Sequence, residues 1–170
     1  MTMLLVLGGC RSGKSRYAQE RCEAVAGGRL AYIATAQAFD AEMEERIARH
    51  RSERGSRWLT LDAPMDLAGA LSEAAGRADA ILVDCLTLWL TNVMLAEADI
   101  AAARGALAEA VAACPVPVIL VANEVGLGIV PDNALARRFR DEAGWLNQRM
   151  ATLCREVVFL AAGLPLTLKG

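Results

Sequence analysis

Residues 8–15, Gly-Gly-Cys-Arg-Ser-Gly-Lys-Ser, match the phosphate-binding loop pattern G-x-x-x-x-G-K-[ST]. Glycines in such a loop let backbone N–H groups curl around phosphate oxygens, while the Lys14 amine reaches the outer phosphates and the Ser15 hydroxyl ligates magnesium. An apolar run from Met3 to Leu7 precedes the loop, and a helix-like segment from Ser15 to Ala26 follows it. A glycine turn without a ligand can carry the same pattern, but this context favours a nucleoside triphosphate bound through its phosphates.

A second group of chemistry-bearing residues surrounds His50, the single histidine of the chain. Five arginines flank it, namely Arg46, Arg49, Arg51, Arg54 and Arg57. One interpretation is a solvent-exposed basic helix capped by Asp40, with His50 packed beside Met43 and Ile47 on an apolar face. The other is nucleophilic catalysis, because surrounding positive charge disfavours the imidazolium and leaves a neutral nitrogen to attack a phosphoryl group that the arginines stabilise. That attack forms a phosphoramidate.

Short β-rich runs alternate with helical patterns, which predicts one α/β domain, residues 1–170, with a mostly parallel sheet flanked by helices. The expected strands are Met3 to Leu7, Arg29 to Thr35, Trp58 to Leu61, Ala80 to Asp84, Val116 to Ala122 and Glu156 to Ala162. Helices are expected at 15–26, from 67 up to Gly76, and from near Asp132 to Leu153. The alanine-rich stretch 96–113 forms one helix or two, because Gly105 interrupts it, and residues 164–168 form an edge strand or hairpin.

Parallel sheets bind ligands at the carboxyl ends of their strands, so the residues found there are the next candidates. Asp84 ends an apolar strand, as does the carboxylate that holds magnesium opposite a phosphate loop. Residues 34–36 follow the second strand, and they either let a nucleotide approach the backbone or form a plain loop. Glu124 follows the fifth strand, where it is either a base or metal partner or part of a structural turn.

Composition excludes several classes of protein. The net charge of -2, from 18 basic and 20 acidic residues, gives no overall field to attract nucleic acid or anionic lipid. Although 55% of residues are hydrophobic, no run of about 18 lacks charges, and the N-terminus carries no signal segment, so we expect a cytoplasmic protein without a membrane span. The five cysteines are scattered, which favours packed, reduced thiols over a disulfide framework or a zinc site.

Four blocks of sequence resemble one known family, and together they cover nearly the whole chain. They are GGCRSGKSRYAQE from Gly8, YIATAQAFDAEMEERIARHR from Tyr32, VDCLTLWLTN from Val83 and ANEVGLGIVPDNALARRFRDEAGWLNQRM from Ala122. The chain resembles the bifunctional adenosylcobinamide kinases and adenosylcobinamide-phosphate guanylyltransferases of cobalamin biosynthesis. The resemblance implies a RecA-like phosphate-loop fold and a homo-oligomer, commonly a trimer.

The same resemblance implies two reactions. ATP or GTP phosphorylates the terminal hydroxyl of the aminopropanol arm of adenosylcobinamide, and GMP is then transferred from GTP to that phosphate through a guanylylated histidine. The catalytic residues would be His50 and Lys14, and Ser15 and Asp84 would hold Mg²⁺. The guanine nucleotide would contact Gly8, Gly9, Cys10, Arg11, Ser12, Gly13, Lys14, Ser15, Ala34, Thr35, Ala36, Arg51, Ser52, Glu53, Arg54, Asp62 and Asp84.

Two other functions fit the motifs. A small-molecule kinase of another pathway would use the arginines to bind an acceptor phosphate, and would transfer the γ-phosphate without forming a GMP adduct. A nucleotide-gated binding module would bind GTP without corrinoid-dependent turnover.

Overall fold

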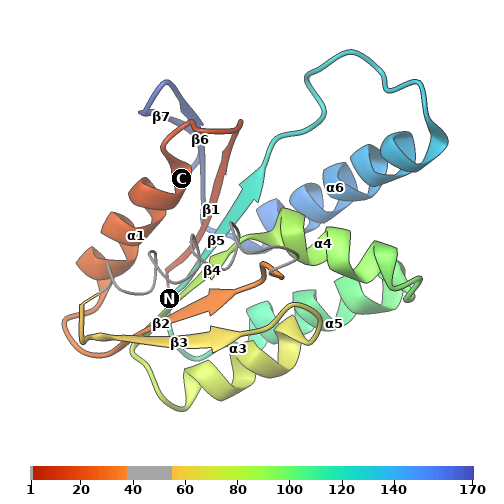
Figure 1. Ribbon diagram of the computed structural model, residues 1–170. Coiled ribbons are helices and arrows are strands. Elements are labelled where there is room, and N and C mark those ends of the chain that lie inside the picture. The colour runs from red at the N-terminus through yellow and green to blue at the C-terminus, as the bar shows by residue number, and fades with distance from the viewer. Residues whose placement is uncertain (1, 38–54) are drawn as a thin grey trace.

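The computed structural model describes residues 2–37 and 55–170, and one seven-stranded sheet runs through them (Figure 1). The strands lie in the order β3-β2-β4-β5-β1-β6-β7. Their bounds are β1 Met3–Gly8, β2 Leu30–Ala34, β3 Trp58–Asp62, β4 Ala80–Asp84, β5 Val118–Asn123, β6 Glu156–Ala161 and β7 Leu164–Lys169. Neighbouring strands from β3 to β6 are parallel, whereas β7 pairs antiparallel with β6. The mostly parallel α/β fold predicted from the sequence is confirmed.

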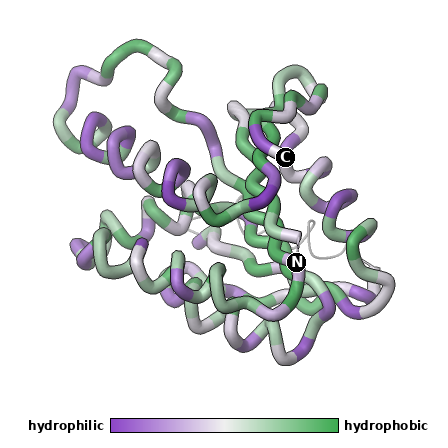
Figure 2. The backbone as a smooth tube through the Cα atoms, turned by 180° about the vertical axis from the view of Figure 1, so that it is seen from behind, coloured by the Kyte–Doolittle hydropathy of each residue, from purple (hydrophilic) through white to green (hydrophobic). Residues whose placement is uncertain are grey.

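Helices cover both faces of this sheet (Figure 1). On one face lies α1 (Lys14–Val25), and on the other lie α3 (Leu67–Ala75), α4 (Leu86–Leu95), α5 (Ile100–Ala113) and α6 (Ala134–Leu153). Alternate residues of β1 enter two cores, with Leu4 and Val6 packed on the α1 side and Leu5 and Leu7 on the opposite side. Burial on both faces explains why the central strands are continuous apolar runs, which Figure 2 colours as hydrophobic.

The six strands expected from the sequence all exist, with ends within two residues of those expected. The largest difference is at β5, which begins at Val118 because proline at 117 has no N–H to donate to the ladder.

The alanine-rich stretch forms a single helix, α5, which Asp99 caps by accepting a hydrogen bond from the Ala102 N–H at 2.9 Å. The C-terminal residues form the edge strand β7 of a hairpin with β6. The apolar run after Asp84, for which the sequence analysis expected no element, forms α4.

Four of the five cysteines are buried, as expected for packed thiols, and Cys10 is exposed in the phosphate loop. Burial raises the pKa of the Cys22 and Cys154 thiols to about 12, so both stay neutral at physiological pH. Within residues 2–37 and 55–170, no helix combines the length and the apolar character that crossing a membrane requires.

Candidate active site

Most of the residues that the sequence analysis selected lie at one edge of the sheet, where the parallel strands have their carboxyl ends. The register pairs Ala34 at the end of β2 with Asp62 of β3 on one side and with Asp84 of β4 on the other. It also pairs Gly8 at the end of β1 with Asn123 of β5. The phosphate loop and the two candidate carboxylates therefore open onto the same edge, which is where α/β sheets of this kind bind ligands.

The phosphate loop turns sharply between β1 and α1. Gly13 has a φ of 92°, a left-handed conformation that favours glycine, and the Lys14 Nζ bends back to donate a hydrogen bond to the Gly9 carbonyl at 3.0 Å. A Cβ atom on Gly8 would lie 2.5 Å from the Ser12 Oγ and 2.8 Å from the Leu160 carbonyl oxygen, so only glycine fits there. No side chain caps the N-terminus of α1. Its free N–H groups and positive dipole end are therefore available to an anion held in the loop.

Contacts from distant parts of the chain hold this loop in place. The Gly163 N–H, in the turn between β6 and β7, donates to the Ser12 carbonyl at 2.9 Å, and the Glu124 N–H donates to the Gly8 carbonyl at 3.0 Å. Gly163 could not be assigned to the site from the sequence, because nothing local in the sequence indicates which strand lies beside β1.

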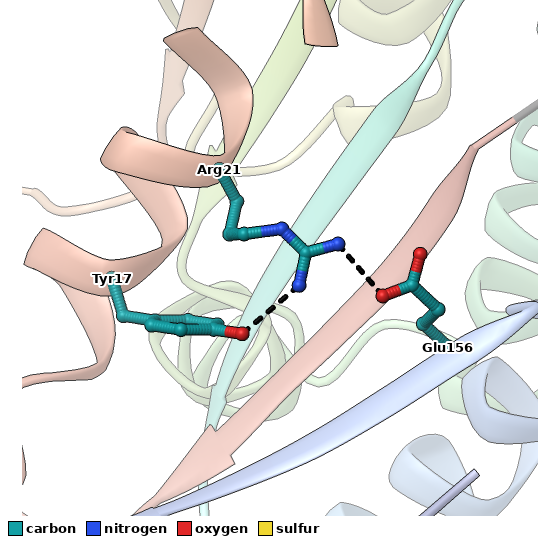
Figure 3. A network of polar contacts seen from close by, with 3 residues as sticks. All are labelled: Tyr17, Arg21 and Glu156. Carbon is teal, nitrogen blue, oxygen red and sulfur yellow. Dashed lines mark hydrogen bonds and ion pairs between the residues drawn. The ribbon is translucent and has the colours of Figure 1, made fainter. Parts of the chain in front are cut away.

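A polar network also fixes α1 against β6 (Figure 3). The Arg21 guanidinium donates to the Glu156 carboxylate at 2.7 Å and to the Tyr17 hydroxyl at 2.9 Å. The hydrogen bond to Glu156 raises the pKa of Arg21 above its ordinary value, while partial burial opposes that rise. Both partners of the ion pair are partly exposed, so it serves mainly to orient the helix that follows the phosphate loop.

Asp84 ends β4 at the edge onto which the phosphate loop opens. It is half-buried at the end of β4, and its Oδ2 accepts a hydrogen bond from the Tyr32 hydroxyl at 3.2 Å. Burial and the neighbouring Asp84 charge raise the pKa of the Cys85 thiol, which is therefore neutral and a poor metal ligand. The described part of the chain holds no cluster of three or more His, Cys, Asp or Glu side chains suited to a metal.

The small residues at the end of β2 differ in their surroundings. Ala34 and Thr35 are buried, whereas Ala36 is half-buried. The Thr35 Oγ1 donates to the Cys85 carbonyl at 2.7 Å and accepts from the Cys85 N–H at 2.8 Å, so its hydroxyl is used within the protein. Asp62 is exposed, and the Ala63 N–H that follows it donates to the Ala34 carbonyl at 2.8 Å.

Glu124 lies in a turn with contacts of its own. One of its carboxylate oxygens accepts a hydrogen bond from the Gly126 N–H, and Arg140 of α6 donates to the Gly126 carbonyl. These contacts favour the structural turn over a base or metal partner, the two interpretations that the sequence left open.

The arginine-rich segment lies largely outside the described residues. His50 is outside them, as are Arg46, Arg49, Arg51, Ser52, Glu53 and Arg54. Arg57 is described, and its guanidinium donates to the carbonyls of Ala26 at 2.8 Å and Gly28 at 3.2 Å. Because Arg57 precedes β3, it lies at the amino edge of the sheet, opposite the phosphate loop. The interpretation in which all five arginines stabilise a phosphoryl group is therefore wrong for Arg57.

The strand order and the loop at the end of β1 define the class, a phosphate-loop nucleotide-binding α/β protein with a RecA-like arrangement. The structure is similar to the flagellar accessory protein FlaH from Methanocaldococcus jannaschii, with a TM-score of 0.57 over 99% of this chain and 78% of that one. The two sequences are 12% identical, so this likeness concerns the fold alone.

The model of the family described as cobinamide kinase / cobinamide phosphate guanyltransferase matches residues 4–168. The bifunctional adenosylcobalamin biosynthesis protein CobP of Pseudomonas aeruginosa is 52% identical over 98% of this chain and 96% of its own length. The corresponding protein CobU of Salmonella typhimurium is 40% identical over 98% of this chain and 99% of its own length. The chain belongs to this family and is an enzyme with its two activities, kinase and guanylyltransferase.

Proposed function

We propose that one catalytic domain, residues 1–170, carries out both reactions in sequence on adenosylcobinamide. ATP or GTP first phosphorylates the terminal hydroxyl of the aminopropanol arm, and GMP from GTP is then transferred to that phosphate, giving adenosylcobinamide-GDP. The observation that carries the proposal is the uncapped N-terminus of α1, with its phosphate loop, on the same strand edge as Asp84. That edge offers one set of charges and N–H groups that both reactions can use.

The residues named for the two reactions have separable roles in this proposal. In the kinase step, the substrate hydroxyl attacks the γ-phosphorus and the nucleoside diphosphate leaves. In the guanylyl step, a nitrogen of His50 attacks the α-phosphorus and pyrophosphate leaves; an oxygen of the corrinoid phosphate then attacks the same phosphorus and His50 departs. Lys14 stabilises phosphate charge in both, exchanging its hydrogen bond to the Gly9 carbonyl for the nucleotide. Apart from the bond to His50, the protein forms no covalent bond to the substrates in this proposal. Positioning of the reactants therefore supplies most of the rate acceleration.

The nucleotide contacts follow from the same edge. Residues 8–15 take the phosphates, and Ala34, Ala36, Asp62 and Asp84 border the rest of the nucleotide, with residues 51–54 added from the sequence. Thr35 lies between Ala34 and Ala36, but its side chain takes no part in these contacts, because it is fully buried and its hydroxyl is already bonded to Cys85.

Mg²⁺ fits the oxygen donors of this edge. Ser15 offers a hydroxyl and Asp84 a carboxylate, and Mg²⁺ typically takes one or two such protein ligands while phosphates and water complete its shell. When bound, the ion would neutralise charge on the phosphates.

We expect Asp84→Asn to raise the Mg²⁺ concentration that gives half-maximal turnover by about tenfold or more, because the amide removes a negative charge from the site. Steady-state titration of Mg²⁺ at saturating nucleotide measures this. Asp79→Asn is the matched control, because Asp79 precedes β4 at the opposite edge of the sheet, where its carboxylate accepts from the Arg29 N–H at 2.8 Å. If this Mg²⁺ concentration rises equally in both variants, Asp84 is not a magnesium ligand.

We also propose that the chain forms a homo-oligomer, a trimer by the family resemblance. Leu164, Leu166 and Leu168 are exposed along the edge strand β7, and an apolar edge of this kind is usually covered in a stable protein. Sedimentation velocity at micromolar concentration tests this; a monomer there would count against it.

The experiment that tests the two proposed reactions uses GTP labelled in either the α- or the γ-phosphate. We expect α-labelled GTP to leave protein-bound label that is acid-labile and base-stable, the behaviour of a phosphoramidate, and adenosylcobinamide phosphate to discharge it. We expect γ-label to move to adenosylcobinamide. Transfer of γ-label without any protein-bound GMP would favour the kinase of another pathway, and GTP binding without either transfer would favour a binding module.

A further inference from the structure

A buried polar network joins α4 to the carboxyl ends of the strands that border the candidate site. Asn92 of α4 is 7% exposed, and its Nδ2 donates to the Thr35 carbonyl at 2.8 Å and to the Pro64 carbonyl at 2.9 Å. Thr35 is fully buried, and its hydroxyl makes two hydrogen bonds to the backbone of Cys85. It donates to the Cys85 carbonyl at 2.7 Å and accepts from the Cys85 N–H at 2.8 Å. One amide and one hydroxyl thus connect the segments that follow β2, β3 and β4.

The Thr35 and Asn92 side chains are polar groups in a largely apolar interior. Within the described residues, Ser12, Thr35 and Asn92 are the polar or charged side chains that are buried, and the neighbours of Asn92 on α4, such as Val93 and Leu90, are apolar. Burying an amide or a hydroxyl costs free energy unless it is hydrogen-bonded, and a valine or leucine would fill the same space without that requirement. Both side chains direct their hydrogen bonds to backbone groups directly after the strands, rather than to other side chains. Their effect is therefore to fix the path of the backbone at the site.

The network reaches Asp84 through the next residue. Cys85 follows Asp84, and both backbone groups of Cys85 are held by the Thr35 hydroxyl, while the Thr35 N–H donates to the Asp84 carbonyl at 3.3 Å. Asn92 fixes Thr35 in turn through its carbonyl. With the backbone after Asp84 fixed in this way, and with the Tyr32 hydroxyl donating to the Asp84 Oδ2 at 3.2 Å, the carboxylate is held toward one geometry that a ligand can use.

We propose that Thr35 and Asn92 are positioning residues, which orient the Asp84 carboxylate toward a nucleotide-bound divalent cation without touching the nucleotide with their own side chains. This inference rests on the magnesium role proposed above for Asp84. A positioning role and a packing role of Thr35 make different predictions. If Thr35 positions Asp84, loss of its hydroxyl should weaken the contribution of Mg²⁺ to nucleotide binding, and not nucleotide binding in general.

The test compares Thr35→Val, which keeps the shape of threonine and loses the hydroxyl, with Thr35→Ser, which keeps the hydroxyl. The probe is the α,β-methylene analogue of GTP, which cannot donate GMP. Its affinity is measured by calorimetric titration into each protein, once in the presence of Mg²⁺ and once in the presence of EDTA. We expect the gain in affinity that Mg²⁺ gives to the parent to fall by about tenfold in Thr35→Val and to persist in Thr35→Ser, while affinities in EDTA agree within about twofold.

Two further variants separate positioning from loss of stability. Val111→Ala removes buried volume from α5, away from the network, and should lower the melting temperature while leaving the Mg²⁺ gain intact. Asn92→Ser keeps one donor and should lose an intermediate part of the gain; it also replaces Thr35→Val should that variant not fold.

Each outcome decides between separate claims. A Mg²⁺ gain in Thr35→Val equal to that of the parent, or an equal loss of affinity with and without Mg²⁺, overturns the inference and leaves the proposed function intact. A parent protein whose affinity does not depend on Mg²⁺ overturns the magnesium role itself, and the inference with it.

Discussion

Lys14→Ala is expected to lower the turnover of both reactions by about 10²- to 10³-fold, because it removes a charged donor aimed at phosphate oxygens. In the structure the Lys14 amine lies over the phosphate loop, bonded to the Gly9 carbonyl at 3.0 Å, and that single contact gives the folded protein little stability. The melting temperature should therefore change little while both activities fall. Initial rates of γ-phosphate transfer to adenosylcobinamide and of GMP transfer to adenosylcobinamide phosphate measure the two losses.

The chain offers a matched control, because it has one other lysine. The Lys169 amine donates to the carbonyls of Ala151 at 2.9 Å and Cys154 at 2.6 Å, at the C-terminal end of α6. β7 pairs Lys169 with Val157 near the start of β6, so this lysine lies at the sheet edge opposite the phosphate loop. Lys169→Ala removes the same charge and should reduce stability while leaving both turnover rates near those of the parent.

The Lys14 experiment also tests whether one loop serves both reactions. If Lys14→Ala keeps one activity near the parent level and loses the other, the retained reaction does not use this loop. A second nucleotide site would then be required, and the single-edge arrangement proposed above would be wrong.

Local sequence patterns predicted the elements that position the site. The apolar runs of β1 and β4 and the glycines between Gly8 and Gly13 depend on short-range geometry, which the sequence reports directly. Asp84 was found in the same way, since it is the last residue of an apolar strand. The start of the fifth strand was less well defined, because apolar residues lie on both sides of Pro117 and the sequence alone does not show whether the ladder needs the N–H that proline lacks.

Thr35 was expected at the site, but its hydrogen bonds and its partner Asn92 were missed for a common physical reason. The hydrogen bonds between Thr35 and Cys85 join residues 50 positions apart, and that between Asn92 and Thr35 joins residues 57 apart. Both depend on β2 lying beside β4 in the sheet, a pairing between strands that are not consecutive. Arg57 was misassigned on similar grounds: its place among the arginines suggested a common site, whereas the strand that follows it begins at the far edge.

His50→Ala is expected to abolish protein-bound GMP and to reduce GMP transfer by about 10⁴-fold or more, because the variant has no nucleophile to attack the α-phosphorus. The kinase step should keep its rate within a few fold, since the substrate hydroxyl attacks the γ-phosphorus directly. The two reactions use one phosphate loop but different nucleophiles, so Lys14→Ala and His50→Ala should give different patterns of loss. His50→Asn, which retains a polar side chain without an imidazole, should behave as His50→Ala does. Label on His50→Ala equal to that on the parent would place the covalent intermediate on another residue, and equal loss of both reactions would give His50 a general role in nucleotide binding.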